Sequence, residues 1–270
     1  MTRPSRPKPV AAPAESDPAL DARRAALFVL QAALKRRGGL DEALSAGPAA
    51  RLTPLDRSFC RALVMAALRH LGPIDRALDA RLAKEPPEPV RDILRLGAAQ
   101  AFWLDVPDFA AVDTTVSLAP KPLRGLVNAV MRGLVRDGAP ACPPEDLAPA
   151  WLLARWRAAF GEADAEAVAA RIAEEPQTDL TLRDPADAAA LAPELEASVL
   201  PGGSLRTARR GDLAAWPGFA EGRWWVQDAA AAIPARLLNA RPGETALDLC
   251  SAPGGKTFQL AAAGAAVTAL

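Results

Sequence analysis

One stretch decides the fold of the C-terminal part of this 270-residue chain: Leu247-Asp248-Leu249-Cys250-Ser251-Ala252-Pro253-Gly254-Gly255-Lys256-Thr257. Its apolar start predicts a buried strand at 245–249. The small residues and Pro at 251–255 predict a tight loop, and the spacing that follows predicts a helix over 255–263. A further strand at 265–270 completes a strand–loop–helix–strand order, which is typical of the first unit of a parallel α/β sheet.

The loop between this strand and helix has the features of a ligand site. Gly254 and Gly255 allow the backbone to approach a ligand closely. The helix N-terminus presents free N–H groups and the positive end of its dipole. Generic physics predicts only a nucleotide-like or anionic ligand, and an ordinary strand–helix turn is the alternative. A phosphate loop ending at Thr257 would need Gly where Cys250 stands.

A wider set of motifs carries a family resemblance. Val226-Gln227-Asp228, Pro242-Gly243-Glu244 and the stretch 248–257 together resemble the RNA cytosine-C5 methyltransferases of the NOL/NOP/Sun family. Ala231 departs from the Ser that the family usually has. The resemblance implies that S-adenosylmethionine (S-adenosyl-L-methionine) is the cofactor. It implies that the cofactor-binding residues are Cys250, Ser251, Ala252, Pro253, Gly254, Gly255 and Lys256.

The N-terminal half has a helical period throughout. It predicts helices at 18–37, 53–72, 73–83, 88–104, 109–119 and 122–137, with Thr53-Pro54 as a start signal. Three motifs, at 56–60, 90–100 and 125–132, resemble a NusB-type helical RNA-binding domain. A NusB-like domain before a methyltransferase domain is the layout of the RsmB (Sun, Fmu) type, which methylates a cytosine of 16S rRNA.

The sequence therefore predicts a multidomain chain. We expect a disordered Pro-rich leader at 1–17 and an all-α NusB-like domain at 18–140. An α+β RNA-recognition linking segment follows at 144–222, with two helices before residue 175 and a strand at 178–183. The beginning of a Rossmann-like α/β methyltransferase domain is expected at 223–270, with a strand at 224–227 and a helix at 229–238.

Basic residues suggest where RNA would bind. Four of them recur along one predicted helix near Asn128, and we predict a phosphate-contacting face from Lys121, Arg124, Arg132 and Arg136. A solvated helix face is the alternative. Of the 32 basic residues 27 are Arg, which suits phosphate binding, although genomic base composition is the favoured explanation. The net charge of zero does not decide the question.

The resemblance also implies catalytic residues that this sequence lacks. The family attacks cytosine C6 with a cysteine and releases product with a second, both in Pro-Cys and Thr-Cys motifs after the cofactor loop. No cysteine follows Cys250, so we predict no catalytic residue here, an incomplete methyltransferase domain, weak cofactor binding and no catalysis. Cys60 is expected in the core and Cys142 in a loop. Residues from about 225 onward are expected to be marginally folded.

Other features exclude several classes of protein. Three widely spaced cysteines and one histidine, His70, favour neither a disulfide framework nor a zinc site. His70 is expected to cap a helix C-terminus. No apolar run approaches the length of a membrane span, and no secretory signal is visible, so we expect a cytoplasmic protein. The family resemblance implies RNA, 16S rRNA, as its partner, and we expect a monomer. The alternative function is a NusB-like RNA-binding module linked to transcription antitermination, with a vestigial C-terminus.

Overall fold

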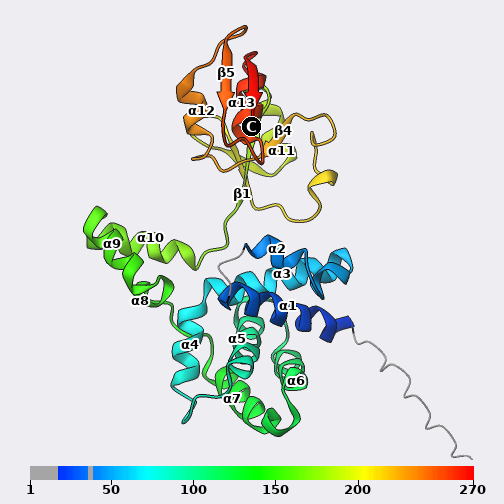
Figure 1. The fold of residues 1–270 in the computed structure, drawn as a ribbon, viewed down its shortest axis with the longest axis vertical. Helices are drawn as coiled ribbons and strands as arrows, with labels where there is room; N and C mark the ends of the chain where they lie inside the picture. Colours follow the sequence, from blue (N-terminus) through cyan, green and yellow to red (C-terminus); the bar gives the residue numbers. More distant parts are fainter. Residues whose placement is uncertain (1–17, 36–38) are drawn as a thin grey trace, which may run out of the picture. The chain divides into compact units, whose positions relative to one another are not determined.

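The computed structural model describes residues 18–35 and 39–270, in two compact units (Figure 1). One unit ends at Glu174 and the other runs from Glu175 to Leu270. The predicted leader at 1–17 and the predicted helix end at 36–37 lie outside the described residues. In the parts of the chain that the structure describes, no helix has both the length and the apolar character needed to cross a membrane.

The N-terminal unit is helical, as predicted. Its helices are α1 (Pro18–Lys35), α2 (Leu40–Leu44), α3 (Pro54–Arg69), α4 (Leu71–Asp79), α5 (Glu88–Trp103), α6 (Asp108–Leu118), α7 (Arg124–Asp137), α8 (Pro144–Leu147), α9 (Ala150–Phe160) and α10 (Glu162–Ile172). Two 3-10 turns, η1 (Ala49–Arg51) and η2 (Lys121–Leu123), lie between them. A shared core joins α1, α3, α5 and α7, and its largest fully buried side chains include Leu30, Leu63, Leu94 and Met131.

Helix α3 shows where local signals predict structure well. The Thr53 side chain accepts a hydrogen bond from the Asp56 backbone N–H at 3.2 Å, and Pro54 takes the first helical position, so the predicted start is confirmed. The predicted end at residue 72 is wrong. His70 leaves the helical conformation with φ −111° and ψ 24°, ending α3, and α4 begins at the next residue. His70 is the C-cap of α3, as predicted.

Residues 144–172 form three helices where the sequence predicted two. Helix α8 ends before Ala148, and Pro149 is the N-cap of α9. A residue before proline is pushed out of the helical conformation, which separates the two helices. The boundary between the two units falls after α10, within the predicted linking segment.

The C-terminal unit contains a small antiparallel sheet, as the α+β prediction required. Its strands, in the order β2-β3-β1-β4, are β1 (Thr178–Leu182), β2 (Ala197–Val199), β3 (Leu205–Thr207) and β4 (Trp224–Val226). Helix α11 (Ala188–Glu194) and 3-10 turns η3 (Pro185–Asp187) and η4 (Leu213–Ala215) connect them. The core of this sheet holds Leu180, Leu182, Leu191, Leu195, Leu205, Trp216 and Trp224.

A parallel pair of strands follows, β5 (Thr245–Asp248) and β6 (Ala266–Ala269), joined by α13 (Gly255–Ala262). Helix α12 (Ile233–Leu238) precedes them; the predicted start at 229 is wrong. The Asp228 carboxylate accepts hydrogen bonds from the Ala230 and Ala231 N–H groups, which holds a turn before the helix begins.

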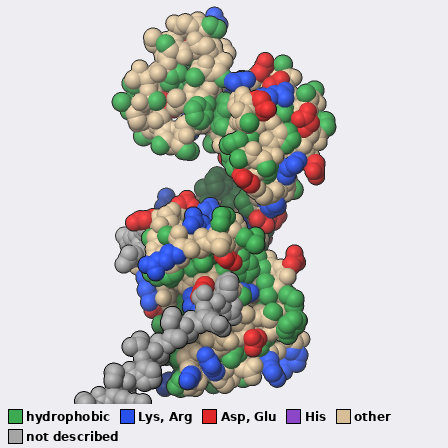
Figure 2. Space-filling model, turned by 90° about the vertical axis from the view of Figure 1, so that its right-hand side faces the viewer, with side chains coloured by type: hydrophobic (Ala, Val, Ile, Leu, Met, Phe, Trp, Pro, Cys, Tyr) green, Lys and Arg blue, Asp and Glu red, His purple; other side chains and the backbone are tan. Residues whose placement is uncertain are grey.

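Strand β5 is not buried, contrary to the prediction. Leu247 is 61% exposed, and Leu249 just after the strand is 65% exposed. Alternate residues Ala246 and Asp248 are half-buried on the other face, which α13 covers. Within the described residues β5 pairs with β6 alone, so its other edge and one face are open. Figure 2 shows few charged side chains at the top of the view, where Figure 1 places β5 and α12.

Candidate functional site

The predicted cofactor loop leads from β5 into the first turn of α13. Gly254 has φ +105°, a conformation that side chains rarely adopt, and it is the N-cap of α13. Its N–H donates to the Ser251 carbonyl at 2.5 Å, and its carbonyl accepts from the Phe258 N–H at 2.8 Å. The requirement for glycine here is a property of the turn itself.

Gly255 is held close to the protein rather than left open. A Cβ at this position would lie 3.0 Å from the Gln227 side chain. The Gln227 amide donates to Gln259 of α13 at 2.8 Å and accepts from the Trp225 indole at 2.8 Å. Gln227 therefore fixes the start of α13 against the end of β4, a role that was not predicted from the sequence.

Asp248 orients the loop through a side-chain hydrogen bond. Asp248 is half-buried, and its carboxylate accepts a hydrogen bond from the Thr257 hydroxyl at 2.7 Å. The bond ties the end of β5 to the first turn of α13. Ser251 is also fixed, because its N–H donates to the Leu270 carbonyl at 3.1 Å.

The remaining loop residues face outward. Cys250, Ala252, Pro253 and Lys256 are exposed, while Ser251, Gly254 and Gly255 are half-buried. Helix α13 starts directly behind them and leaves its first N–H groups directed at the loop. The arrangement offers backbone donors and a lysine charge to a polar or anionic ligand.

An ion pair between the buried Asp179 and the exposed Arg206 joins two strands of the antiparallel sheet. Asp179 of β1 accepts hydrogen bonds from Arg206 of β3 at 2.6 and 2.8 Å, and from the Ala229 N–H at 3.0 Å. The bonds from Arg206 hold the pKa of the Asp179 carboxyl below its ordinary value, against the opposing effect of burial. This carboxylate joins the antiparallel sheet to the segment that precedes α12.

The predicted RNA face is only partly assembled. Arg132 and Arg136 lie beside Asn128 in a groove of about 590 Å³ between α6 and α7. Arg124, at the start of α7, donates instead to the Ser117 and Ala119 carbonyls at the end of α6, each at 3.2 Å.

Lys121 precedes α7 in the turn η2, rather than lying on the helix. Phe109, which is 78% exposed, and Asp108 also line the groove that holds Arg132 and Arg136. Neither residue was predicted from the sequence, because both belong to α6 rather than to the helix that carries the arginines.

The three cysteines are free and lie in distinct environments. Cys60 is buried in the helical core, as predicted, and burial raises the pKa of its thiol to about 11. Cys142 lies in the loop before α8, as predicted, and burial raises the pKa of its thiol as well. Cys250 is exposed in the predicted cofactor loop.

Comparison with known proteins shows what the chain is similar to. The model of the NusB family matches residues 20–136. The chain is also 33% identical to the probable ribosomal RNA small subunit methyltransferase B of Synechocystis sp., over 90% of this chain and 60% of that protein. It is 38% identical to ribosomal RNA small subunit methyltransferase B of Thermus thermophilus, over 86% of this chain and 55% of that protein.

These matches confirm the family resemblance predicted from the sequence, over nearly nine-tenths of the chain. The chain spans between 55% and 60% of the length of these two relatives. Among solved structures, the crystal structure of PH0851 aligns with a TM-score of 0.59 at 18% identity, covering 97% of this chain and 64% of that one. At that identity the likeness concerns the fold alone.

Proposed function

We propose that this chain carries the RNA-binding and cofactor-binding parts of an S-adenosylmethionine-dependent cytosine-C5 methyltransferase acting on 16S rRNA. The supporting observation is the similarity of nearly nine-tenths of the chain to proteins named ribosomal RNA small subunit methyltransferase B. In this proposal the β5–α13–β6 unit is the beginning of a Rossmann-like sheet, with the ligand site at the carboxyl end of its first strand.

The residues present fit the cofactor. Residues 250–256 would hold S-adenosylmethionine, since the turn at Gly254 exposes the loop and sets the N-terminus of α13 behind it. When bound, the cofactor supplies the methyl group for transfer. This chain's contribution is to shape the loop, through the Asp248–Thr257 bond and the contact between Gly255 and Gln227.

We assign no catalytic residue within this chain. A cysteine nucleophile must be available as thiolate. The buried Cys60 thiol, with its pKa near 11, does not meet this requirement, and burial also raises the pKa of Cys142. Cys250 is proposed as a residue of the cofactor loop, not as the nucleophile.

Calorimetric titration of the full chain with S-adenosylmethionine tests the cofactor site. We expect weak binding to the wild-type chain and at least about tenfold weaker binding, roughly 1.4 kcal/mol, to Gly254→Val, because a β-branched residue strains the turn at φ +105°. Gly125→Ala is the matched control, since a Cβ there meets no atom within 4 Å. Equal affinities for wild type and Gly254→Val would reject the loop as the site.

A second function, RNA binding by the NusB-family unit itself, is supported by the groove that brings Arg132, Arg136 and Asn128 together. Filter binding of the full chain to RNA, with log K plotted against log salt concentration, tests it. Arg132→Gln is expected to reduce the slope by about one. Lys84→Gln, an exposed residue outside the groove, is the control. A wild-type slope near zero would sink this proposal.

A further inference from the structure

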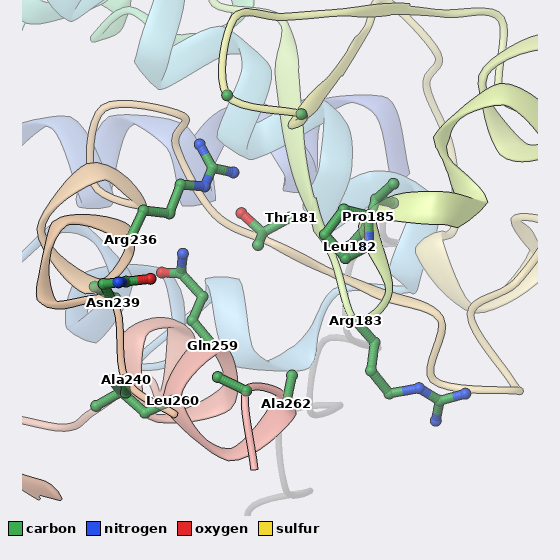
Figure 3. Close-up of a pocket in the computed structure, with 14 residues that line it drawn as sticks. Thr181, Leu182, Arg183, Pro185, Arg236, Asn239, Ala240, Gln259, Leu260 and Ala262 are labelled. Atoms are coloured by element: carbon green, nitrogen blue, oxygen red, sulfur yellow. The ribbon is translucent and has the colours of Figure 1, made fainter. Parts of the chain in front are cut away.

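A second cavity, of about 360 Å³, lies in the C-terminal unit (Figure 3). The end of β1, the turn between β2 and β3, and the C-terminal halves of α12 and α13 line it. No residue of the cofactor loop at 250–256 lines it. Its size is at the lower end of the range for small-ligand pockets, about 300–1,000 Å³, which suits one nucleotide and excludes a duplex.

Thr181 supplies the first sign of a ligand. Strand alternation places Leu180 and Leu182 in the core of the sheet, and Asp179 and Thr181 on the opposite face. Asp179 has its hydrogen bonds satisfied by Arg206 and the Ala229 N–H. Thr181 is only 3% exposed, yet its hydroxyl oxygen has no hydrogen-bond partner among the described residues. Figure 3 shows that oxygen directed toward the side of the cavity where Arg236 lies.

The two charged side chains that line the cavity are both arginines. The C-terminal unit has seven arginines, and ion pairs with carboxylates hold four of them: Arg206, Arg209, Arg210 and Arg223. Two of the other three, Arg183 and Arg236, line this cavity, and no carboxylate does. Their hydrogen bonds go to neutral groups: Arg236 donates to the Ser204 hydroxyl at 2.7 Å, and Arg183 to the Glu221 carbonyl at 3.3 Å. These charges favour a phosphate.

The remaining walls suit a base. Leu182, Pro185 and Leu260 provide apolar surface, while Asn239 lies at the end of α12. In Figure 3 the Asn239 amide points into the cavity, and no side-chain partner holds it among the described residues. An amide both donates and accepts, as does a hydroxyl, so the two groups can bond the polar edge of an unpaired base.

We propose that this cavity binds one unpaired nucleotide of an RNA strand. The base lies against the apolar walls and bonds to Thr181 and Asn239, and its phosphate lies at Arg236. Figure 3 shows Arg183 pointing away from the other lining side chains, where it meets the phosphate of a neighbouring nucleotide. This assignment rests on the proposed RNA substrate and gives it a contact distinct from the cofactor loop.

The test is fluorescence anisotropy of the full chain with a short single-stranded RNA. Thr181→Val has the same shape and removes only the hydroxyl. Because that hydroxyl has no partner, we expect an unchanged melting temperature with RNA affinity about threefold to tenfold weaker. Asn239→Gly removes the amide and keeps the backbone at φ +51°, with the same expected loss. Arg236→Gln should lower the salt slope by about one.

Arg241→Gln is the matched control, since Arg241 is exposed and does not line the cavity, and only its backbone N–H bonds a carboxylate, that of Glu244. It removes the same charge, and its affinity should stay close to wild type. If Arg241→Gln lost as much RNA affinity as Arg236→Gln, the loss would reflect net charge rather than this cavity, and the site would be overturned. Cross-linking of RNA that carries 4-thiouridine should label peptides at 181–185 or 236–240, and labels confined to other peptides would also overturn it.

Two further outcomes separate this inference from the proposed function. Wild-type chain that binds no RNA overturns the RNA substrate, and this site with it. RNA binding that Thr181→Val, Asn239→Gly and Arg236→Gln all leave unchanged overturns the site alone. Competition by cytidine 5′-monophosphate at the same concentration as the RNA strand would assign the cavity to a free nucleotide and overturn the strand assignment.

Discussion

At the scale of single residues, the least predictable contacts join distant parts of the sequence. Alternation of apolar and polar residues predicted a strand at 178–183, and β1 spans Thr178–Leu182, with Asp179 and Thr181 on one face. It could not indicate that Asp179 meets Arg206, 27 residues further on, or that Thr181 has no partner. Period-two patterns define the faces of a strand but not the groups that cover them.

Asp179→Asn tests the ion pair between β1 and β3. An amide cannot accept both Arg206 bonds together with the Ala229 N–H bond in the same way, and a buried donor is left weaker or unsatisfied. We expect the C-terminal unit to lose about 1–3 kcal/mol of unfolding free energy at neutral pH. Urea unfolding followed by hydrogen exchange of the β1 and β3 amides measures it. Glu221→Gln removes one negative charge from the same unit at an exposed position and should change little.

The same contact predicts a pH dependence. The folded-state pKa of Asp179 lies below its unfolded value, so the stabilisation is present above the unfolded pKa, near 4, and is lost as pH falls through the folded pKa. Wild-type stability should therefore fall on acidification below about pH 4, and this part of the fall should be absent from Asp179→Asn. An identical acid profile for the two proteins would contradict the assignment.

At the scale of elements, the sequence indicated the order of helices and strands better than their packing. The Thr53 cap and the Gly254 turn are local, and both were predictable. The exposure of β5 was not predictable, because a short apolar run predicts a buried strand whether or not neighbouring elements cover it. The family motif also did not indicate why glycine is needed at position 255. The Gln227 side chain lies against Gly255 and leaves little room for a Cβ.

Two glycines in helices, one tightly packed and one open, test how packing decides the effect of an added Cβ. A Cβ on Gly97 of α5 would lie 2.6 Å from the Met131 sulfur of α7 and 2.7 Å from Thr115 of α6. Gly97→Ala should destabilise the N-terminal unit by about 1–3 kcal/mol through overpacking. Gly125→Ala, where the Cβ meets no atom within 4 Å, should stabilise it by about 0.4–1 kcal/mol. Denaturant midpoints measure both, and a stabilising Gly97→Ala would disprove the close packing of α5 on α6 and α7.

At the scale of the whole molecule, each of the two units has its own core, and the degree of pairing differs within the C-terminal unit. Strand β1 is central, bonded to β3 and β4, whereas β5 has only β6 among the described residues and exposes Leu247. The predicted marginal folding of residues from about 225 onward therefore has a physical basis in an open strand edge. The open edge also predicts that the β5–β6 pair unfolds locally before β1.

Hydrogen exchange of the full chain measures that order. We expect the amides bonded within the β5–β6 pair to be at least about tenfold less protected than those of β1, a difference of about 1.4 kcal/mol in opening free energy. Saturating S-adenosylmethionine should raise the protection of β5 and α13, because a ligand at 250–256 binds only the closed form, and about 100-fold excess over its dissociation constant adds roughly 2.7 kcal/mol. We expect β1 to open independently of β5, so cofactor binding should leave the protection of the β1 amides unchanged. Equal protection of β5 and β1 without ligand would contradict marginal folding, whereas unequal protection that the cofactor leaves unaltered would keep the open edge and remove the loop as its binding site.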